Sequence, residues 1–211
     1  MLTFHKFSKS YGKHLILGIP NLEIPAGIHW LKGHNGSGKT TLFRILAGLI
    51  PYQGEIILNQ NLNLRNQPVL HRRYISYAEA EPLYPDFLTG QELINLFTEA
   101  RQAPAKQAAT LTEYFVADYL HTPIGTYSSG MQKKLSLLLA FIGTPQLILL
   151  DEPLITLDTA TVDLVYQLIR EYHQEYQTNF LFSSHQDMLM PQLPLTATWL
   201  VQDKSLIKLP A

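Results

Sequence analysis

The sequence contains no cysteine, few charged residues and no excess of charge of either sign. Without cysteine, the 211 residues exclude a disulfide framework and a thiolate metal site. Charged residues make up 16% of the chain, where about a quarter is usual in globular proteins. The net charge of −1 lacks the basic surplus of proteins that bind nucleic acid. We therefore expect a reducing compartment and no nucleic-acid partner.

Long apolar runs are also missing. The most apolar region, residues 135–150, is broken by Gly143, Pro145 and Gln146, so it falls short of the roughly 18 residues that a membrane span requires. Residues 1–9 lack the apolar core of a signal peptide. These absences predict a soluble, cytoplasmic chain.

A glycine-dense loop lies between a predicted strand at residues 28–31 and a predicted helix at residues 41–49. It fits the phosphate-loop pattern G-x-x-x-x-G-K-[ST], in which backbone N–H groups and the helix N-terminus bind a polyphosphate. The residues are Gly33, His34, Asn35, Gly36, Ser37, Gly38, Lys39 and Thr40. The alternative is a glycine-rich turn with a chance Lys-Thr, and the flanking strand and helix argue against it.

Three side chains of this stretch have predicted contacts with a nucleotide. Lys39 is expected to reach the β- and γ-phosphates, and the Thr40 hydroxyl to bind Mg²⁺. We include Thr41, in the first helical turn, among the nucleotide-binding residues. Upstream, Tyr11 lies in a predicted loop at residues 8–13, where its ring can stack on a purine. Taken alone, Tyr11 is an ordinary tyrosine at a loop edge.

Two other predicted strands end in polar residues. Residues 147–150 form an apolar run typical of a parallel strand buried on both faces, and Asp151 and Glu152 follow it. Acids at this end of a strand lie where open α/β sheets bind ligands, so Asp151 is placed to hold Mg²⁺ and Glu152 to orient or deprotonate water. A solvated acidic turn is the alternative. His185 follows the predicted strand at residues 180–182 and is placed to hydrogen-bond a γ-phosphate.

The order of the predicted elements indicates an α/β fold. Further strands are expected at residues 2–6, 15–24, 55–58, 75–78, 196–201 and 205–209, a helix at 159–176 and a surface loop at 59–68. From residue 89 to about 143 the pattern is helical and divided by prolines into three helices, with Thr89 and Glu92 as a capping box. We predict one domain over residues 1–211, with a nucleotide-binding core at 1–81 and 144–211 and a helical subdomain at 82–143.

One stretch distinguishes this chain from other phosphate-loop proteins. The residues Tyr127-Ser128-Ser129-Gly130-Met131-Gln132-Lys133-Lys134-Leu135 resemble the signature motif of the ATP-binding subunits of ABC transporters, at that family's spacing before residues 147–152. As a bare string, this stretch is also a helix N-cap. The resemblance covers nearly the whole chain. It implies a RecA-like P-loop ATPase core with a mostly parallel sheet, an N-terminal antiparallel β portion and an inserted α-helical subdomain.

The resemblance also implies roles for single residues. Tyr11 stacks on adenine, Asp151 is the metal-orienting acid, Glu152 the catalytic base and His185 the switch histidine. Asp158 lies at the dimer interface. The signature residues bind the nucleotide held by the other subunit, and they are Ser128, Ser129, Gly130 and Met131. One departure is Ala80, between Glu79 and Glu81, where the family usually has a glutamine that ligates Mg²⁺.

The function implied by the resemblance is that of an ATP-binding and ATP-hydrolysing subunit of a small export-type ABC transporter, using ATP and Mg²⁺. Two copies are expected to sandwich two ATP molecules head to tail as a homodimer. The helical subdomain is expected to grip a separate transmembrane permease, which places the chain on the inner face of the cell membrane. The alternative is a soluble ABC-type ATPase switch in DNA repair or translation. A third hypothesis, a subunit that does not hydrolyse ATP, rests on Ala80 alone.

Overall fold

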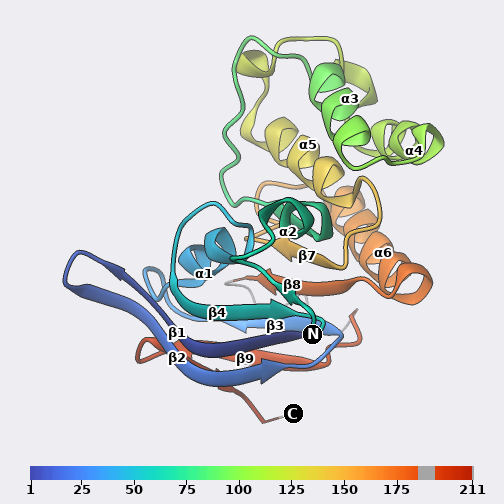
Figure 1. Ribbon diagram of the computed structural model, residues 1–211. Helices are drawn as coiled ribbons and strands as arrows, with labels where there is room; N and C mark the ends of the chain where they lie inside the picture. The colour runs from blue at the N-terminus through green and yellow to red at the C-terminus, as the bar shows by residue number, and fades with distance from the viewer. Residues whose placement is uncertain (185–192, 211) are drawn as a thin grey trace.

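Two β-sheets and a set of helices make up the computed structural model, which describes residues 1–184 and 193–210 (Figure 1). The first sheet is antiparallel and has the strand order β2-β1-β4-β5. The second has the order β10-β9-β3-β8-β7-β6 and is parallel except for β10. The strands are β1 (Leu2–Tyr11), β2 (His14–Ile24), β3 (Ile28–Lys32), β4 (Gln53–Leu58), β5 (Leu62–Asn63), β6 (Ile75–Ala78), β7 (Leu147–Leu150), β8 (Asn179–Ser183), β9 (Ala197–Gln202) and β10 (Ser205–Lys208).

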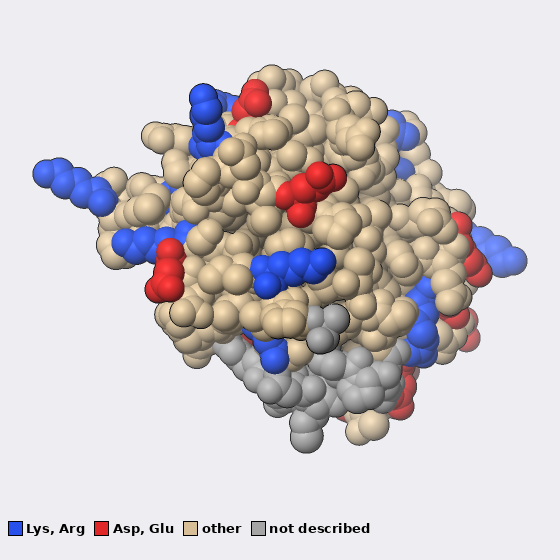
Figure 2. Space-filling model, turned by 90° about the horizontal axis from the view of Figure 1, so that it is seen from below, with Lys and Arg blue, Asp and Glu red and all other residues tan. Residues whose placement is uncertain are grey.

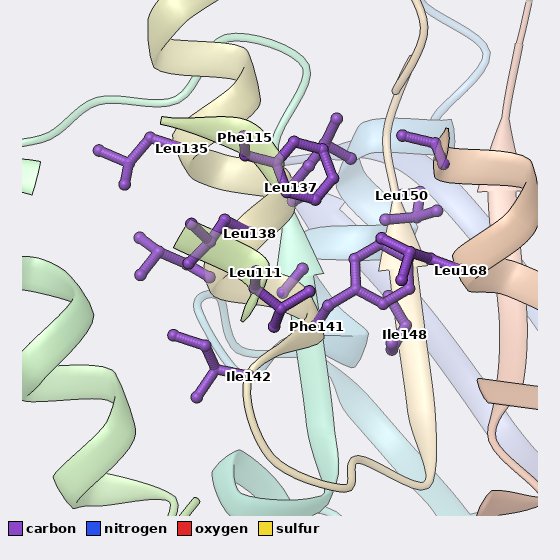
Figure 3. Packing of buried hydrophobic residues seen from close by; sticks show 14 of the residues in the cluster. Leu111, Phe115, Leu135, Leu137, Leu138, Phe141, Ile142, Ile148, Leu150 and Leu168 are labelled. Carbon is purple, nitrogen blue, oxygen red and sulfur yellow. The ribbon is translucent and has the colours of Figure 1, made fainter. Parts of the chain in front are cut away.

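Strand β7 shows how the parallel sheet is buried on both faces. Leu147 and Leu149 pack into a core shared with α1 (Lys39–Leu46) and the antiparallel sheet. Ile148 and Leu150 pack into the opposite core, with α5 (Ser129–Phe141) and α6 (Thr159–Tyr176). Figure 3 shows this second core, where side chains of α4, α5, β7 and α6 converge. A continuous apolar run is what a strand covered on both faces requires.

The helical part contains the three predicted helices. These are α3 (Gly90–Ala100), α4 (Ala105–Phe115) and α5, with short 3-10 turns η1 (Ala117–Tyr119) and η2 (Ile124–Thr126) before α5. The capping box is present, because Thr89 Oγ1 accepts from Glu92 N at 3.2 Å and Glu92 Oε2 accepts from Thr89 N at 2.8 Å. In Figure 1, α3 and α4 lie beyond α5 as seen from the sheets. The α/β fold class with its antiparallel portion and helical part is confirmed, and the residue limits of the subdomains stay a prediction.

One helix was not predicted from the sequence. Helix α2 (Pro68–Tyr74) begins at the end of the predicted surface loop. Its anchor is the buried ring of His71, whose Nδ1 lies 3.1 Å from Leu64 O and whose Nε2 faces Leu46 O. The contact with Leu46 joins segments that are 25 residues apart in sequence. Only Pro68 at the first turn was a local signal.

Two other boundaries differ from the prediction by three residues or more. Strand β1 continues to Tyr11, where a loop was expected at residues 8–13, because residues 8–11 pair with β2. Helix α1 begins at Lys39 and ends at Leu46, three residues before the predicted end. Ala47 and Gly48 still donate backbone hydrogen bonds into the last turn, and Gly48 has a positive φ of 75°, which ends the helix.

Candidate nucleotide-binding site

The phosphate loop connects β3 to α1 and is shaped by its glycines. Gly33, Gly36 and Gly38 have φ values of 156°, 78° and 111°, in the region that favours glycine. A Cβ on Gly33 would lie 2.6 Å from Ser37 Oγ and 3.0 Å from Val201 O. The loop therefore has no space for a side chain at this position.

Unsatisfied polar groups line the same loop. The Ser37 hydroxyl is buried without a hydrogen-bond partner in the described part of the chain. Gly38 is the N-cap of α1, so the first N–H groups of the helix also point toward the loop. Buried donors of this kind are normally hydrogen-bonded. The cradle thus fits the oxygens of a phosphate, as the predicted nucleotide-binding role requires.

Lys39 lies folded over the loop. Its Nζ donates to Gly33 O at 2.7 Å and to His34 O at 3.3 Å, and only 6% of the residue is exposed. Burial lowers the pKa of the Lys39 ammonium, while the nearby carboxylates of Glu152 and Asp151 favour its charged form. His34 and Asn35, by contrast, are exposed at the outer edge of the loop.

Asp151 lies at the end of β7 with both carboxylate oxygens held. Thr40 Oγ1 donates to Oδ2 at 2.7 Å, and Ser183 Oγ donates to Oδ1 at 2.6 Å. The structure thus brings Thr40 and Asp151 together, as predicted for the metal site. Hydroxyl and carboxylate oxygens suit Mg²⁺, which takes few protein ligands and completes its shell with water and phosphate. Accordingly, the described residues contain no cluster of three or more acidic or histidine ligands.

Glu152 follows in an uncommon backbone conformation. Its φ of 47° lies in the left-handed region, where a residue other than glycine is held only by its surroundings. Its backbone N–H donates to Ser183 Oγ at 3.0 Å. Ser183, fully buried at the end of β8, therefore contacts both predicted acids. No role was predicted for Ser183, and its place directly after the predicted apolar strand at residues 180–182 was the available signal.

Lys133 was also missed, although it lies within the signature stretch. It is 2% exposed, and its Nζ donates to Glu79 O at 2.8 Å, Ala80 O at 3.1 Å and Asp151 O at 2.9 Å. Burial lowers its pKa to about 8, although Asp151 and Glu152 favour the charged form. The available signal was spacing, because Lys133 precedes the buried Leu137 by one helical turn.

The signature residues begin α5. Ser128 is the N-cap, and its Oγ accepts from Met131 N at 3.2 Å. Ser128 and Ser129 are exposed, and a Cβ on Gly130 would lie 3.2 Å from Thr156 O. Among the described residues, no hydrogen bond joins this stretch to the phosphate loop, and Figure 1 shows the start of α5 well away from α1. The two stretches therefore do not form one site within the chain.

Three further predicted residues lie on other segments or outside the described chain. Tyr11 is 54% exposed at the end of β1, with its ring centroid 4.6 Å from Lys9 Nζ. Asp158 caps α6 and accepts from Lys134 Nζ at 2.7 Å, and this contact, with Thr161, keeps its pKa well below the usual value. His185 lies outside the described residues.

The segment after β6 contains Ala80, at the position where the family usually has a glutamine. The Glu79 carboxylate accepts from Arg44 Nη2 of α1 at 3.2 Å, and Glu81 is exposed. Ala80 contributes its backbone carbonyl to Lys133. Glu79 thus has a cationic partner of its own.

The surface of the chain is sparsely charged. On the face shown in Figure 2, lysine and arginine side chains are scattered among carboxylates and form no single-sign patch. No helix in the part of the chain that the structure describes combines the length and apolarity needed to cross a bilayer.

Comparisons with known proteins agree with this geometry. Residues 19–155 match the family model described as "ABC transporter". "ATP-binding cassette sub-family A member 7" of Rattus norvegicus is 36% identical over 69% of this chain, which spans 7% of that relative's length. "Lantibiotic transport ATP-binding protein SrtF" of Streptococcus pyogenes is 28% identical over 88% of this chain and 80% of its own.

Solved structures show the same fold. A structure described as the ATP-binding subunit of an ABC transporter superimposes with a TM-score of 0.88, at 22% identity, over 99% of this chain and 89% of its own. The dimeric, post-hydrolysis state of the ATP-binding cassette MJ0796 bound to ADP and Pi gives a TM-score of 0.82 at 20% identity, over 100% of both chains. The family match and the phosphate loop together identify the chain as a member of the ABC transporter family that carries this family's ATPase domain.

Proposed function

We propose that the chain binds and hydrolyses ATP as the ATPase subunit of an ABC transporter. The proposal rests on the hydrogen bonds beside the phosphate loop. Thr40 and Ser183 donate to the carboxylate of Asp151, and the next residue, Glu152, donates its backbone N–H to Ser183. Asp151, the proposed metal-binding acid, and the Glu152 carboxylate both follow the carboxyl end of β7, beside the proposed polyphosphate cradle, and this supports the proposal.

Each residue in this proposal has one task. The backbone of the phosphate loop and Lys39 bind the phosphates, while Tyr11 stacks on adenine. Thr40 and Asp151 hold Mg²⁺, which supplies charge neutralisation on the phosphate oxygens. Glu152 accepts a proton from the attacking water. His185 hydrogen-bonds the γ-phosphate, on the strength of the family resemblance.

The proposed working unit is a homodimer. Since the signature residues at the start of α5 lie away from their own phosphate loop, a two-fold dimer brings each signature to the nucleotide of the other chain. The dimeric cassette among the related structures supports this arrangement. Asp158, the N-cap of α6, follows shortly after Thr156, whose carbonyl lies close to Gly130. We propose that Asp158 lies at the dimer interface.

The role of Glu152 is tested by Glu152→Gln, with Glu175→Gln on the exposed end of α6 as the matched control. We expect the Glu152 variant to bind ATP as the wild type does, because the phosphate loop is unchanged. Its hydrolysis should fall by about 100-fold or more, since loss of a general base costs roughly that factor. The control should turn over at the wild-type rate, and wild-type turnover by Glu152→Gln would refute the assignment.

We propose that a separate membrane-spanning partner binds in an apolar groove on the surface of the chain. The groove has a volume of about 760 Å³ and lies between α2, the segment after β6, and α3. Its exposed apolar residues include Leu49 (55%), Val69 (72%), Leu83 (90%) and Leu96 (57%). A cluster of exposed apolar side chains around one groove is a candidate interaction site. The SrtF relative, named as an ATP-binding protein of lantibiotic transport, supports a transporter, and we propose that it is of the export type.

A pull-down from gently solubilised membranes tests the partner. Tagged Glu152→Gln chain with ATP should recover a polytopic membrane protein in about equal amount, because ATP without hydrolysis keeps the dimer closed. Leu83→Asp in the groove should abolish the recovery, and Ile207→Asp on β10, 45% exposed, should not. Recovery with ribosomes or DNA, or from the soluble fraction alone, would favour a soluble ABC-type switch.

A further inference from the structure

The peptide group between Asp151 and Glu152 is held from both sides. Its carbonyl oxygen accepts from Lys133 Nζ at 2.9 Å, and its N–H donates to Ser183 Oγ at 3.0 Å. Lys133 comes from α5 and Ser183 from the end of β8, so two separate elements fix the plane of this one peptide. Both side chains are buried, at 2% and 0% exposed.

This peptide determines where the Glu152 side chain points. Glu152 has a φ of 47°, a conformation that costs free energy and persists only when its surroundings hold it. Release of the Asp151 carbonyl permits the peptide to rotate toward ordinary backbone angles. The Glu152 carboxylate then turns away from its present direction, because the side chain follows its own backbone.

We propose that Lys133 is a positioning residue for ATP hydrolysis, whose ammonium group directs the Glu152 carboxylate by holding the Asp151 carbonyl. The proposal rests on the proposed role of Glu152 as the base. Lys133 itself touches no nucleotide in this account and acts only through the peptide that it holds.

The Lys133 ammonium group donates two other hydrogen bonds, which connect the Glu152 peptide to the segment after β6. They hold the carbonyls of Glu79 and Ala80, where the chain leaves β6 for the helical part, and Glu79 lines the apolar groove. Ala80 has no polar side chain, so this link passes through the backbone. Lys133 therefore connects α5 to both the edge of the groove and the peptide between Asp151 and Glu152.

The neighbouring lysine shows that this placement is specific. Lys134, one residue on, lies at the surface and pairs with Asp158. Arg101 offers a control, because it is a partly buried cation that donates to carbonyls at the C-terminal end of α5. Its Nη1 lies 3.0 Å from Leu139 O and 2.9 Å from Ile142 O, at the opposite end of the helix from Lys133.

The test compares Lys133→Met, Lys133→Arg and Arg101→Met in the full chain, with ATP affinity, kcat and thermal unfolding measured for each. Displacement of a reacting group by about an ångström costs up to roughly 100-fold in rate. We therefore expect kcat of Lys133→Met to fall by about 10- to 100-fold with ATP affinity within about twofold of wild type. Lys133→Arg, which keeps the charge and donors, should recover most of kcat. Arg101→Met should unfold at a lower temperature with kcat unchanged.

A double variant separates positioning from a structural effect. In the Glu152→Gln background, Lys133→Met should slow the residual hydrolysis no further, because the carboxylate that it positions is already gone. An equal further loss in that background, or an unchanged kcat for Lys133→Met, would overturn the proposal. If Lys133→Met does not fold, Lys133→Gln takes its place, because it keeps one donor group. Its kcat is expected to be intermediate, and it is also combined with Glu152→Gln in a double variant. Wild-type hydrolysis by Glu152→Gln alone refutes the proposed base instead, which distinguishes the two failures.

Discussion

At the scale of single residues, His29 illustrates how burial sets a protonation state. It is fully buried in β3, its Nε2 donates to Pro25 O at 2.8 Å, and its Nδ1 accepts from Trp199 Nε1 at 3.3 Å. These two contacts suit the neutral ring with hydrogen on Nε2. Burial also lowers the pKa of His29, because a charged imidazolium loses its hydration there.

This lowered pKa predicts a loss of stability in acid. Below about pH 6.5 the unfolded chain takes up a proton at His29 that the native chain does not, so the free energy of unfolding decreases as pH falls. The slope from this residue approaches about 1.4 kcal/mol per pH unit. Urea unfolding at about pH 7.5 and about pH 5 should therefore show a larger loss for wild type than for His29→Gln. Equal losses in the two proteins would show that His29 does not titrate in this way.

Residues of the site were predictable where a local pattern carries them. Lys39, Thr40, Asp151 and Glu152 were named because a loop pattern and a strand end specify them within a few positions. Ser183 and Lys133 were not, because their roles depend on strands and helices that meet only in the folded chain. The position of Ser183 after an apolar strand, and the spacing of Lys133 to a buried leucine, are local signals that indicate burial but specify no role.

At the scale of elements, helix α3 depends on its capping box. Thr89 Oγ1 accepts from Glu92 N and satisfies one of the free donors in the first turn. Thr89→Ala is expected to lower the free energy of unfolding by about 1 kcal/mol. Thr110→Ala on the exposed face of α4 is the control and should change it by less than about 0.5 kcal/mol in chemical denaturation. A loss as small as the control's would show that the cap contributes little.

The same contrast between local and distant signals explains which elements were predicted. The capping box and the apolar run of β7 are local, and α3 and β7 were predicted from them. Helix α2 was missed because the contact of His71 with Leu46 is tertiary. The end of β1 was missed because its polar residues are held by pairing with β2, which residues 8–13 alone do not reveal.

At the scale of the whole molecule, the proposed catalytic apparatus is divided between two surfaces. The phosphate loop, Asp151 and Glu152 form one, and the start of α5 with Ser128 forms the other. In the proposed dimer, each site therefore takes its loop from one chain and its signature from the other.

Mixing two defective chains tests this division. Lys39→Met removes the loop lysine, and Ser128→Arg blocks the signature, so either variant alone should be nearly inactive. A mixed dimer contains one site with both parts intact, and an equal mixture should recover up to about one quarter of wild-type hydrolysis. As a control, mixing Lys39→Met with Glu152→Gln should recover none, because both changes lie on the same side of the site. Absence of recovery in the first mixture would contradict the division.

The distance between the start of α5 and the phosphate loop in one chain also has a consequence for the living cell. In the proposed dimer a single chain supplies only half of each site, so we expect it to consume no ATP while it is alone, and the law of mass action then protects the cell's energy supply. Newly made or surplus chains stay idle until their local concentration favours association. Anything that gathers two chains at one place then acts as a switch, because crowding the halves together turns hydrolysis on without any change in either chain.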